Sequence, residues 1–346
     1  MSKRVSLADI AASLGISKTV VSLVVNDKGN ANGISKETQQ KVRDKIEELN
    51  YRPNALARGF RTGKTETIGL IVSDISNRFY SRIARQIEDL AWQHGYSVVI
   101  CSTDEMVEKE RKQVRLLLDR KVDGLIVSSS FTDPAYYNEM VEEDIPHVLI
   151  DRLLPDMKSK SVSVDNFGGA QLATRHLINQ GMRDIMLFAT SPEHLSSIND
   201  RVSGFKSAIY AAGINLPEEN IIRIPLGKIE ETIRDTLQKL YQLGKMPEAI
   251  FTLNNISTSV VIKYLSKLSI DIPNETALIG FDETVFFSYT KPSISAIVQP
   301  IELISETAFR ILINQIEKRE QDEKQHIILP VDIVIRDSSV KKAIQH

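Results

Sequence analysis

A single cysteine, a single tryptophan and the lack of any long apolar run distinguish this 346-residue sequence. With Cys101 alone, the chain cannot form an internal disulfide or a cysteine-rich metal site, and because residues 98–100 are apolar we expect Cys101 in a buried core. No stretch approaches the roughly 18 apolar residues needed to cross a bilayer, and the N-terminus lacks the apolar segment of a signal peptide. We therefore expect a cytoplasmic protein without a membrane partner.

The sequence also lacks the motifs of the common α/β enzymes. No glycine-rich dinucleotide fingerprint follows the first apolar run of the large C-terminal part, and no phosphate-binding loop ends in Gly-Lys-Ser or Gly-Lys-Thr. The six histidines do not have the spacing of metal ligands. We therefore expect no catalytic residues, no cofactor and no metal site.

Charge is unevenly distributed along the chain. Residues 1–65 contain 12 Lys and Arg and 6 Asp and Glu, a net charge of +6. The remaining residues contain 31 Lys and Arg and 39 Asp and Glu, a net charge of −8. A basic segment suits a polyanionic partner, whereas an acidic one stays soluble and away from it. At 346 residues the chain is also too long for one ordinary core, so we expect two or three folding units.

The first part of the chain predicts a small, all-α domain. Ser6 can cap a helix over residues 7–14, whose apolar residues share one face, and Gly15 ends it. Ser17 can cap a second helix after a very short turn, and two helices joined this tightly form a helix-turn-helix. Ser35 can cap a third helix that closes the core.

The second predicted helix has two different faces. Its valines at positions 20, 21, 24 and 25 can face the core. The opposite face has a cation, two hydroxyls and one apolar side chain, which can reach guanine acceptors, phosphate oxygens and a thymine methyl group: Lys18, Thr19, Ser22 and Leu23. A solvated helix face is the alternative interpretation of this pattern.

A short helical candidate, bounded by Pro53 and Gly63, follows this domain. It is under about 12 residues and contains Gly59, so we expect it to be marginal in isolation. Such a segment can become ordered when DNA is present.

From residue 66 onward, short apolar runs alternate with helical stretches. The runs lie at 67–72, 96–101, 122–127 and 147–150, and a second series begins at 162–164 and continues at 185–188, 249–252 and 277–280. Continuous apolar strands that alternate with helices indicate parallel sheets covered on both faces. The sequence therefore predicts an α/β body of two doubly wound parallel-sheet lobes.

Polar residues follow several of these strands directly. Because the carboxyl ends of parallel strands meet at one edge of a sheet, two lobes placed face to face form a cleft there. The residues in such positions are Ser73, Asp74, Ser128, Asp151, Arg152, Asn254, Asn255 and Asp282. Loops are commonly polar, so the set as a whole predicts a binding cleft better than any one member does.

The order of several short pieces resembles the lactose/galactose repressor (LacI/GalR) family of bacterial transcription regulators. The pieces include Asp9-Ile10-Ala11, Gly15-Ile16-Ser17, Tyr51-Arg52-Pro53-Asn54, Asp151-Arg152, Gly204-Phe205, Ile279-Gly280-Phe281-Asp282 and Gln299-Pro300. The resemblance covers nearly the whole chain. It implies a helix-turn-helix DNA-binding domain at 1–52, a hinge helix and linker at 53–65, and a periplasmic-binding-protein-like effector-binding and dimerisation domain at 66–346. Within that domain it implies an N-lobe at about 66–163 and 295–325 and a C-lobe at about 164–294 and 326–341.

Site residues follow from the same resemblance. It implies that Lys18, Thr19 and Leu23 read bases and that Ser6, Ser17 and Ser22 contact the DNA backbone. Hinge residues Asn54, Leu56, Ala57, Arg58 and Phe60 would enter the minor groove, with Phe60 at the position of a wedging leucine. The implied effector contacts are Arg201 and Asp282, followed by Ser73, Phe79, Tyr80, Ser128, Asp151 and Asn254.

We therefore expect a sequence-specific DNA-binding transcription regulator of the repressor class. It would bind a pseudo-palindromic operator in double-stranded DNA as a homodimer, under the control of a small molecule. Carboxylate, amide and guanidinium groups beside an aromatic ring favour a carbohydrate effector, and a nucleobase is the alternative. A solute-binding protein without a regulatory role would share the lobes but would need no basic domain, and an α/β enzyme is the less favoured alternative.

Overall fold

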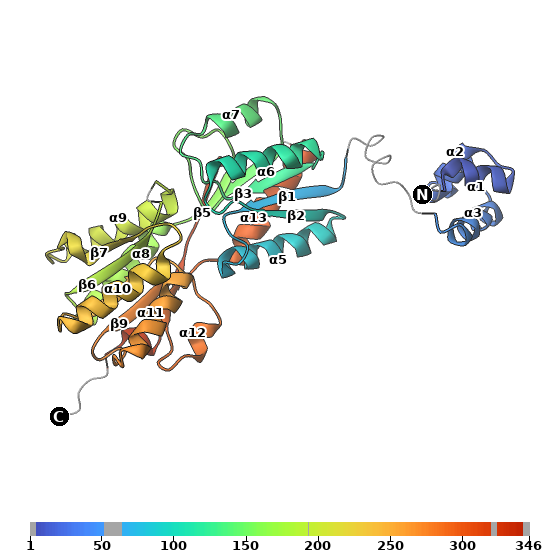
Figure 1. Cartoon of the computed structure of the whole chain (residues 1–346). Helices are drawn as coiled ribbons and strands as arrows, with labels where there is room; N and C mark the ends of the chain where they lie inside the picture. Colours follow the sequence, from blue (N-terminus) through green and yellow to red (C-terminus); the bar gives the residue numbers. More distant parts are fainter. Residues whose placement is uncertain (1–4, 52–63, 193, 320–323, 342–346) are drawn as a thin grey trace. The chain divides into compact units, whose positions relative to one another are not determined.

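The computed structural model describes residues 5–51, 64–192, 194–319 and 324–341. The chain divides into two compact units, Met1–Thr65 and Glu66–His346, which we call the head and the body (Figure 1). In this described part of the chain no single helix is long and apolar enough to span a membrane, and only the first two helices of the head, bent by 115°, pass that test as a pair.

Three helices form the head, as the caps and apolar spacing predict. They are α1 (Leu7–Leu14), α2 (Lys18–Val25) and α3 (Lys36–Glu48), with a 3₁₀ turn at Asn30–Asn32. The side chains of Ser6, Ser17 and Ser35 each accept a backbone hydrogen bond at the N-terminus of their helix. Gly15 ends α1 at a φ of 66°, a left-handed conformation that glycine adopts without strain. The prediction of an all-α helix-turn-helix head is confirmed.

The core of the head is small and comes from all three helices. Its buried residues are Ile10, Ala11, Val21, Val24 and Val42. Among the valines of α2, Val20 and Val25 are only half-buried, so the core uses a narrower face than the sequence pattern suggests. At the start of α2, Lys18 and Thr19 are left exposed.

The N-lobe of the body is built on a parallel six-stranded sheet. Its strands are β1 (Thr67–Val72), β2 (Ser97–Ser102), β3 (Gly124–Val127), β4 (His147–Ile150), β5 (Ser161–Val164) and β11 (His326–Leu329). They lie in the order β11-β5-β4-β3-β1-β2. Cys101 is half-buried, contrary to expectation, because β2 is an edge strand that pairs with β1 alone.

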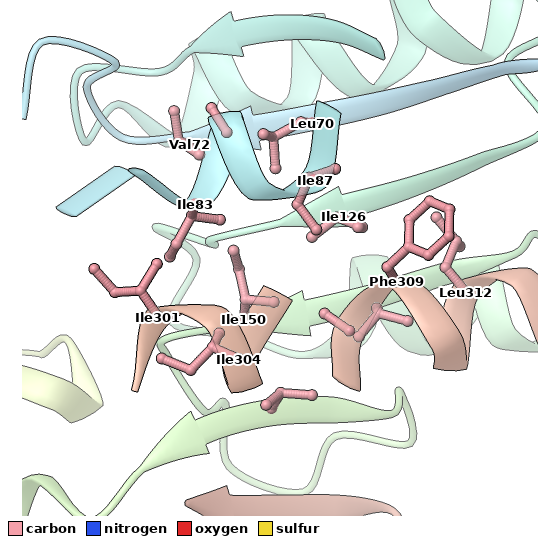
Figure 2. Packing of buried hydrophobic residues seen from close by; sticks show 14 of the residues in the cluster. Leu70, Val72, Ile83, Ile87, Ile126, Ile150, Ile301, Ile304, Phe309 and Leu312 are labelled. Atoms are coloured by element: carbon pink, nitrogen blue, oxygen red, sulfur yellow. The ribbon is translucent and has the colours of Figure 1, made fainter. Parts of the chain in front are cut away.

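Helices cover both faces of this sheet. On one face α5 (Arg78–Gln93) and α13 (Ile301–Ile316) pack against alternate residues of the strands, and Figure 2 shows Ile83, Ile87 and Phe309 among them. On the other face α6 (Val107–Asp119) and α7 (Ala135–Glu142) pack against the residues that point the opposite way. The alternation of side chains along each strand therefore supplies two separate cores.

The C-lobe repeats this plan. Its strands are β6 (Ile185–Thr190), β7 (Ile221–Ile224), β8 (Ala249–Thr252), β9 (Ala277–Phe281), β10 (Ser295–Val298) and β12 (Asp332–Val334), in the order β12-β10-β9-β8-β6-β7. The pairing between β10 and β12 is antiparallel and the other pairings are parallel.

Four helices cover the C-lobe sheet, two on each face. Helices α8 (Asn166–Asn179) and α9 (Ser196–Ala211) share one core, and α10 (Ile229–Gln242) and α11 (Asn255–Lys267) share the other. The short elements are α12 (Phe286–Tyr289) and the 3₁₀ turns Glu218–Asn220 and Asp337–Ser339. The prediction of two doubly wound parallel-sheet lobes is confirmed.

The structure corrects the predicted lobe boundaries at two strands. Strand β10, predicted in the N-lobe, pairs with β9 of the C-lobe, and β11, predicted in the C-lobe, pairs with β5. Strand β5 pairs with β4 of the N-lobe, although the second series of apolar runs begins at its residues. Backbone pairing decides which sheet a strand joins, and apolar runs do not report it. The chain therefore crosses between the lobes at three places: after Val164, at Gln299–Pro300 and at Pro330–Val331.

Candidate functional site

The strand order places a crevice at matching points of the two lobes. In the N-lobe the order reverses between β1 and β3, and in the C-lobe between β6 and β8. Loops at such a switch point diverge to opposite faces of the sheet and leave a crevice beyond the carboxyl ends of the strands. A cavity of about 360 Å³ lies there, lined by residues of both lobes.

Seven of the eight predicted effector contacts line this cavity. They are Ser73, Phe79, Tyr80, Asp151, Arg201, Asn254 and Asp282. The eighth, Ser128, is fully buried behind them, and its hydroxyl lies 3.0 Å from that of Tyr80. The structure therefore brings the predicted set together, with Ser128 placed to orient Tyr80 instead of lining the cavity.

Two aspartates occupy equivalent positions in the two lobes. Asp151 follows β4 with a φ of 67°, and Asp282 follows β9 with a φ of 70°. This left-handed conformation is uncommon for residues other than glycine and is often found at functional sites. Both carboxyl groups are buried, and Asp151 accepts a hydrogen bond of 2.8 Å from the Tyr80 hydroxyl.

Arg201 is fixed by the C-lobe. Its Nε donates to Asn166 Oδ1 at 2.8 Å and its Nη1 donates to the Leu253 carbonyl at 2.6 Å, while the guanidinium lies 3.7 Å from the centre of the Phe281 ring. Nη1 also lies 3.8 Å from Asp282 Oδ2. This arrangement pre-orients a buried cation at the cavity wall.

The Asp282 carboxyl lies under opposing influences. Burial raises its pKa, and the nearby Arg201 and the Gln299 side chain, which donates to it, act in the opposite direction. Burial prevails, so the pKa of Asp282 lies above its ordinary value.

Sequence reasoning placed Arg152 among the polar residues after strands but did not single out its partner, Glu105. Arg152 donates to both carboxylate oxygens of Glu105, at 2.6 and 2.7 Å, and to the Ser129 carbonyl at 3.1 Å. Burial alone would raise the pKa of Glu105, but the interaction with Arg152 prevails and lowers it. Glu105 lies three residues after β2, so the rule that selected Arg152 after β4 also points to Glu105.

The two lobes are joined by polar contacts around the cavity. Asn255 Nδ2 of the C-lobe donates to Asn77 Oδ1 of the N-lobe at 3.1 Å. The Leu153 amide of the N-lobe donates to Ser196 Oγ of the C-lobe at 2.7 Å. These contacts join the two lobes beside the cavity.

The predicted DNA contacts in the head differ in their local surroundings. Lys18 and Thr19 are exposed at the start of α2, whereas Ser22 and Leu23 are half-buried. The Ser6 hydroxyl donates to Asp9 Oδ2 at 2.7 Å within the cap of α1.

Other predictions for this part of the site lie beyond what the structure describes. The hinge residues Asn54, Leu56, Ala57, Arg58 and Phe60 lie outside the described residues. Within the described ranges, no group of three or more His, Cys, Asp or Glu is arranged to hold a metal ion.

Known proteins match both units of the chain. Residues 6–54 match the model of bacterial regulatory proteins of the lacI family, and residues 174–339 match that of the periplasmic binding protein-like domain. The ribose operon repressor of Halalkalibacterium halodurans is 33% identical over 334 residues, which are 96% of this chain and 97% of the relative. The chain belongs to the LacI family.

Solved structures extend the likeness of this LacI-family chain to the fold. The lac repressor dimer bound to operator and the anti-inducer ONPF has a TM-score of 0.85 at 24% identity, and the match covers 98% of this chain and 100% of that chain. A periplasmic binding protein/LacI transcriptional regulator from Alkaliphilus metalliredigens complexed with D-xylulofuranose has a TM-score of 0.70 at 29% identity, over 80% and 100% of the two chains. The family resemblance predicted from the sequence is confirmed. This LacI-family chain is a DNA-binding transcription regulator.

Proposed function

We propose that this LacI-family regulator is a repressor that binds a pseudo-palindromic operator as a homodimer and responds to a sugar in the cavity between its lobes. It acts in the cytoplasm, where it has access to DNA, and it catalyses no reaction. One observation carries the proposal: the switch points of the two lobes share a cavity. Asp151 of the N-lobe lines it together with Arg201 and Asp282 of the C-lobe.

The chemistry of the cavity supports a sugar. Buried carboxylate, amide and guanidinium groups can share the paired hydroxyls of a carbohydrate, and Phe79 supplies an aromatic surface for its apolar side. A cavity of about 360 Å³ is at the small end of ligand sites and suits a monosaccharide. The relatives support the same class, since one is a ribose operon repressor and another is complexed with D-xylulofuranose.

The geometry of α2 supports DNA contact through its first turn. The N-terminus of a helix attracts phosphate, because unpaired backbone amides and the helix dipole point there. Lys18 and Thr19 are exposed at this end, and the Ser17 hydroxyl accepts the cap, which leaves its proton available to a phosphate oxygen. Ser6 is a weaker candidate, because its proton is donated to Asp9.

Control of DNA binding would come from the angle between the lobes. Both lobes line the cavity, and Gln299, which donates to Asp282, lies in one of the three segments that cross between them. A ligand that contacts both lobes therefore favours one lobe angle. A complete switch, from 1:99 to 99:1, requires a preference of about 5.5 kcal/mol for one arrangement.

Lys18→Ala tests the proposed base contact. We expect operator binding to weaken by about 1 to 3 kcal/mol and discrimination at one base position to relax. Lys41→Ala is the matched control, because Lys41 is an exposed lysine on α3 that pairs with Glu37. Fluorescence anisotropy with operator and altered operators measures both effects, and equal losses in the two variants would contradict the base-reading role.

A thermal-shift series tests the ligand class. D-ribose, D-xylulose and adenine are added separately to the full chain, because a ligand that binds only the folded state raises its melting temperature. We expect a rise with at least one sugar. A rise with adenine alone would contradict the sugar assignment.

A further inference from the structure

The ionisable groups that line the cavity are mostly acidic. Five carboxyl groups face two guanidinium groups there: Asp74, Asp104, Glu105, Asp151 and Asp282 against Arg152 and Arg201. No lysine or histidine is among the described residues that line the cavity. Even when Lys109, which pairs with Asp104 from outside the cavity, is counted as a third cation, the carboxyl groups exceed the cations by two.

The cation of the N-lobe is already used by the protein. Arg152 is almost fully buried, and it forms a two-point ion pair with Glu105 at 2.6 and 2.7 Å. Its Nη1 also donates to the Ser129 carbonyl, and its Nε lies 3.4 Å from Asp151 Oδ2. Arg152 therefore balances two carboxylates and cannot turn toward a bound anion without leaving them uncompensated.

The cation of the C-lobe is held in a similar way. Arg201 donates through Nε to Asn166 and through Nη1 to the Leu253 carbonyl, and the same Nη1 lies 3.8 Å from Asp282. Its positive charge is therefore matched by the buried Asp282 carboxyl. An anionic ligand would compete with that carboxyl for the same cation.

We propose that the effector is a polyhydroxylated compound without negative charge, and that the cavity rejects its phosphorylated or carboxylated derivatives. This inference rests on the proposed function and specifies the class of sugar. A phosphate group or a carboxylate would lose its hydration and meet an excess of carboxylates. Hydroxyl groups, in contrast, can each donate to these carboxylate oxygens, and an ammonium group would meet an opposite charge.

Matched ligands test the charge preference. Isothermal titration calorimetry of the full chain compares D-ribose with D-ribose 5-phosphate, and D-glucose with D-gluconate, D-glucose 6-phosphate and D-glucosamine. For a sugar that binds, we expect its anionic derivative to bind at least about 100-fold more weakly, which corresponds to about 2.7 kcal/mol. The 5-O-methyl and 6-O-methyl sugars control for the size of the added group, and they should lose less affinity than the phosphates.

Asp74→Asn tests the electrostatic cause directly. Asp74 Oδ1 accepts from the Ser76 amide at 2.8 Å and Oδ2 accepts from the Ser76 hydroxyl at 2.7 Å. An asparagine oxygen retains the first contact, and its amide group can donate to the Ser76 hydroxyl, so the change removes charge with little change of shape. We expect the preference for the neutral over the anionic sugar to fall by about 5-fold to 10-fold at low ionic strength. Asp133→Asn is the matched control, because Asp133 accepts from the Ala135 amide in the same way and does not line the cavity.

The outcomes separate the two levels of the inference. Equal or tighter binding of the anionic sugar would overturn the charge proposal while leaving a sugar-controlled regulator in place. Binding of neither a sugar nor any derivative would contradict the proposed function itself. An unchanged preference in Asp74→Asn, together with size-dependent losses for the O-methyl sugars, would assign the rejection to shape and overturn the electrostatic argument.

Discussion

The pair of Arg201 and Asp282 provides a quantitative test of the site. Both side chains are buried, with 6% and 8% of their surface exposed, and Arg201 Nη1 lies 3.8 Å from Asp282 Oδ2. Arg201→Ala removes the cation and its two hydrogen bonds and leaves the carboxyl of Asp282 in a buried place. Removal of one partner from a buried pair destabilises proteins by about 3 to 5 kcal/mol.

The double variant separates the charge from the packing. In Arg201→Ala combined with Asp282→Asn, no uncompensated carboxyl remains, so we expect the double variant to be more stable than the sum of the single changes by about 1 to 3 kcal/mol. Asp282→Asn alone costs less than Arg201→Ala, because Arg201 keeps its hydrogen bonds to Asn166 and Leu253. Additive losses would refute the claim that the two groups compensate each other.

Urea denaturation of the full chain, followed by far-ultraviolet circular dichroism, measures these free energies of unfolding. Calorimetric titration of each variant measures sugar binding, which we expect Arg201→Ala to abolish. Operator binding without effector should remain, because the head has its own core around Val21 and Val24. Normal sugar binding by Arg201→Ala would remove Arg201 from the effector site.

Three further changes test other parts of the account. Phe60→Ala should weaken operator binding, measured by fluorescence anisotropy, without weakening sugar binding. The reason is that a smaller side chain cannot insert between two stacked base pairs. Unchanged operator affinity would contradict this role of Phe60. Gly204→Ala should destabilise the C-lobe by about 1 to 3 kcal/mol in urea denaturation, because an added Cβ would lie 2.2 Å from the carbonyl oxygen of Phe167 on the adjacent helix. An unchanged urea midpoint would show that the two helices can move apart to accept the methyl group. Burial lowers the pKa of His147, so the folded state favours the neutral imidazole. The unfolded chain binds a proton at this histidine more readily, so the protein loses stability as the pH falls below the ordinary pKa of 6.5. His147→Asn should therefore reduce the loss of stability between about pH 7.5 and 5.5, and an identical pH dependence in the variant would contradict this explanation.

Elements determined by neighbouring residues could be predicted from the sequence. The helices of the head begin after Ser6, Ser17 and Ser35 because a serine side chain accepts a hydrogen bond from the next turn. Gly15 ends the first helix for a similarly local reason. Strands β1 and β4 lie at the predicted residues, because their apolar runs are short and continuous.

Features that depend on distant pairing could not be predicted in this way. The family resemblance placed residues 295–325 in the N-lobe and 326–341 in the C-lobe. Strands β10 and β11 each join the other lobe, because their partners are β9 and β5. Half-burial of Cys101 follows from the edge position of β2, which also depends on the order of the strands.

The candidate site also combines features that follow from local sequence with features that depend on distant contacts. Six of the eight polar residues predicted after strands line the cavity, since strand ends meet at one edge of a parallel sheet. The ion pair of Arg152 with Glu105 was not predictable, because it joins loops 47 residues apart in the sequence. The placement of Ser128 behind Tyr80, instead of on the cavity wall, depends on side-chain packing that sequence position does not report.

Operator affinity with and without a neutral sugar tests the central claim most directly. At about 0.15 M salt the full chain should prefer particular genomic fragments over random duplex by about a thousandfold or more, and a sugar that binds the body should change that affinity. In Arg201→Ala the fragment preference should remain and the sugar effect should disappear. Equal affinity for all fragments, whether or not any sugar is present, would contradict the account.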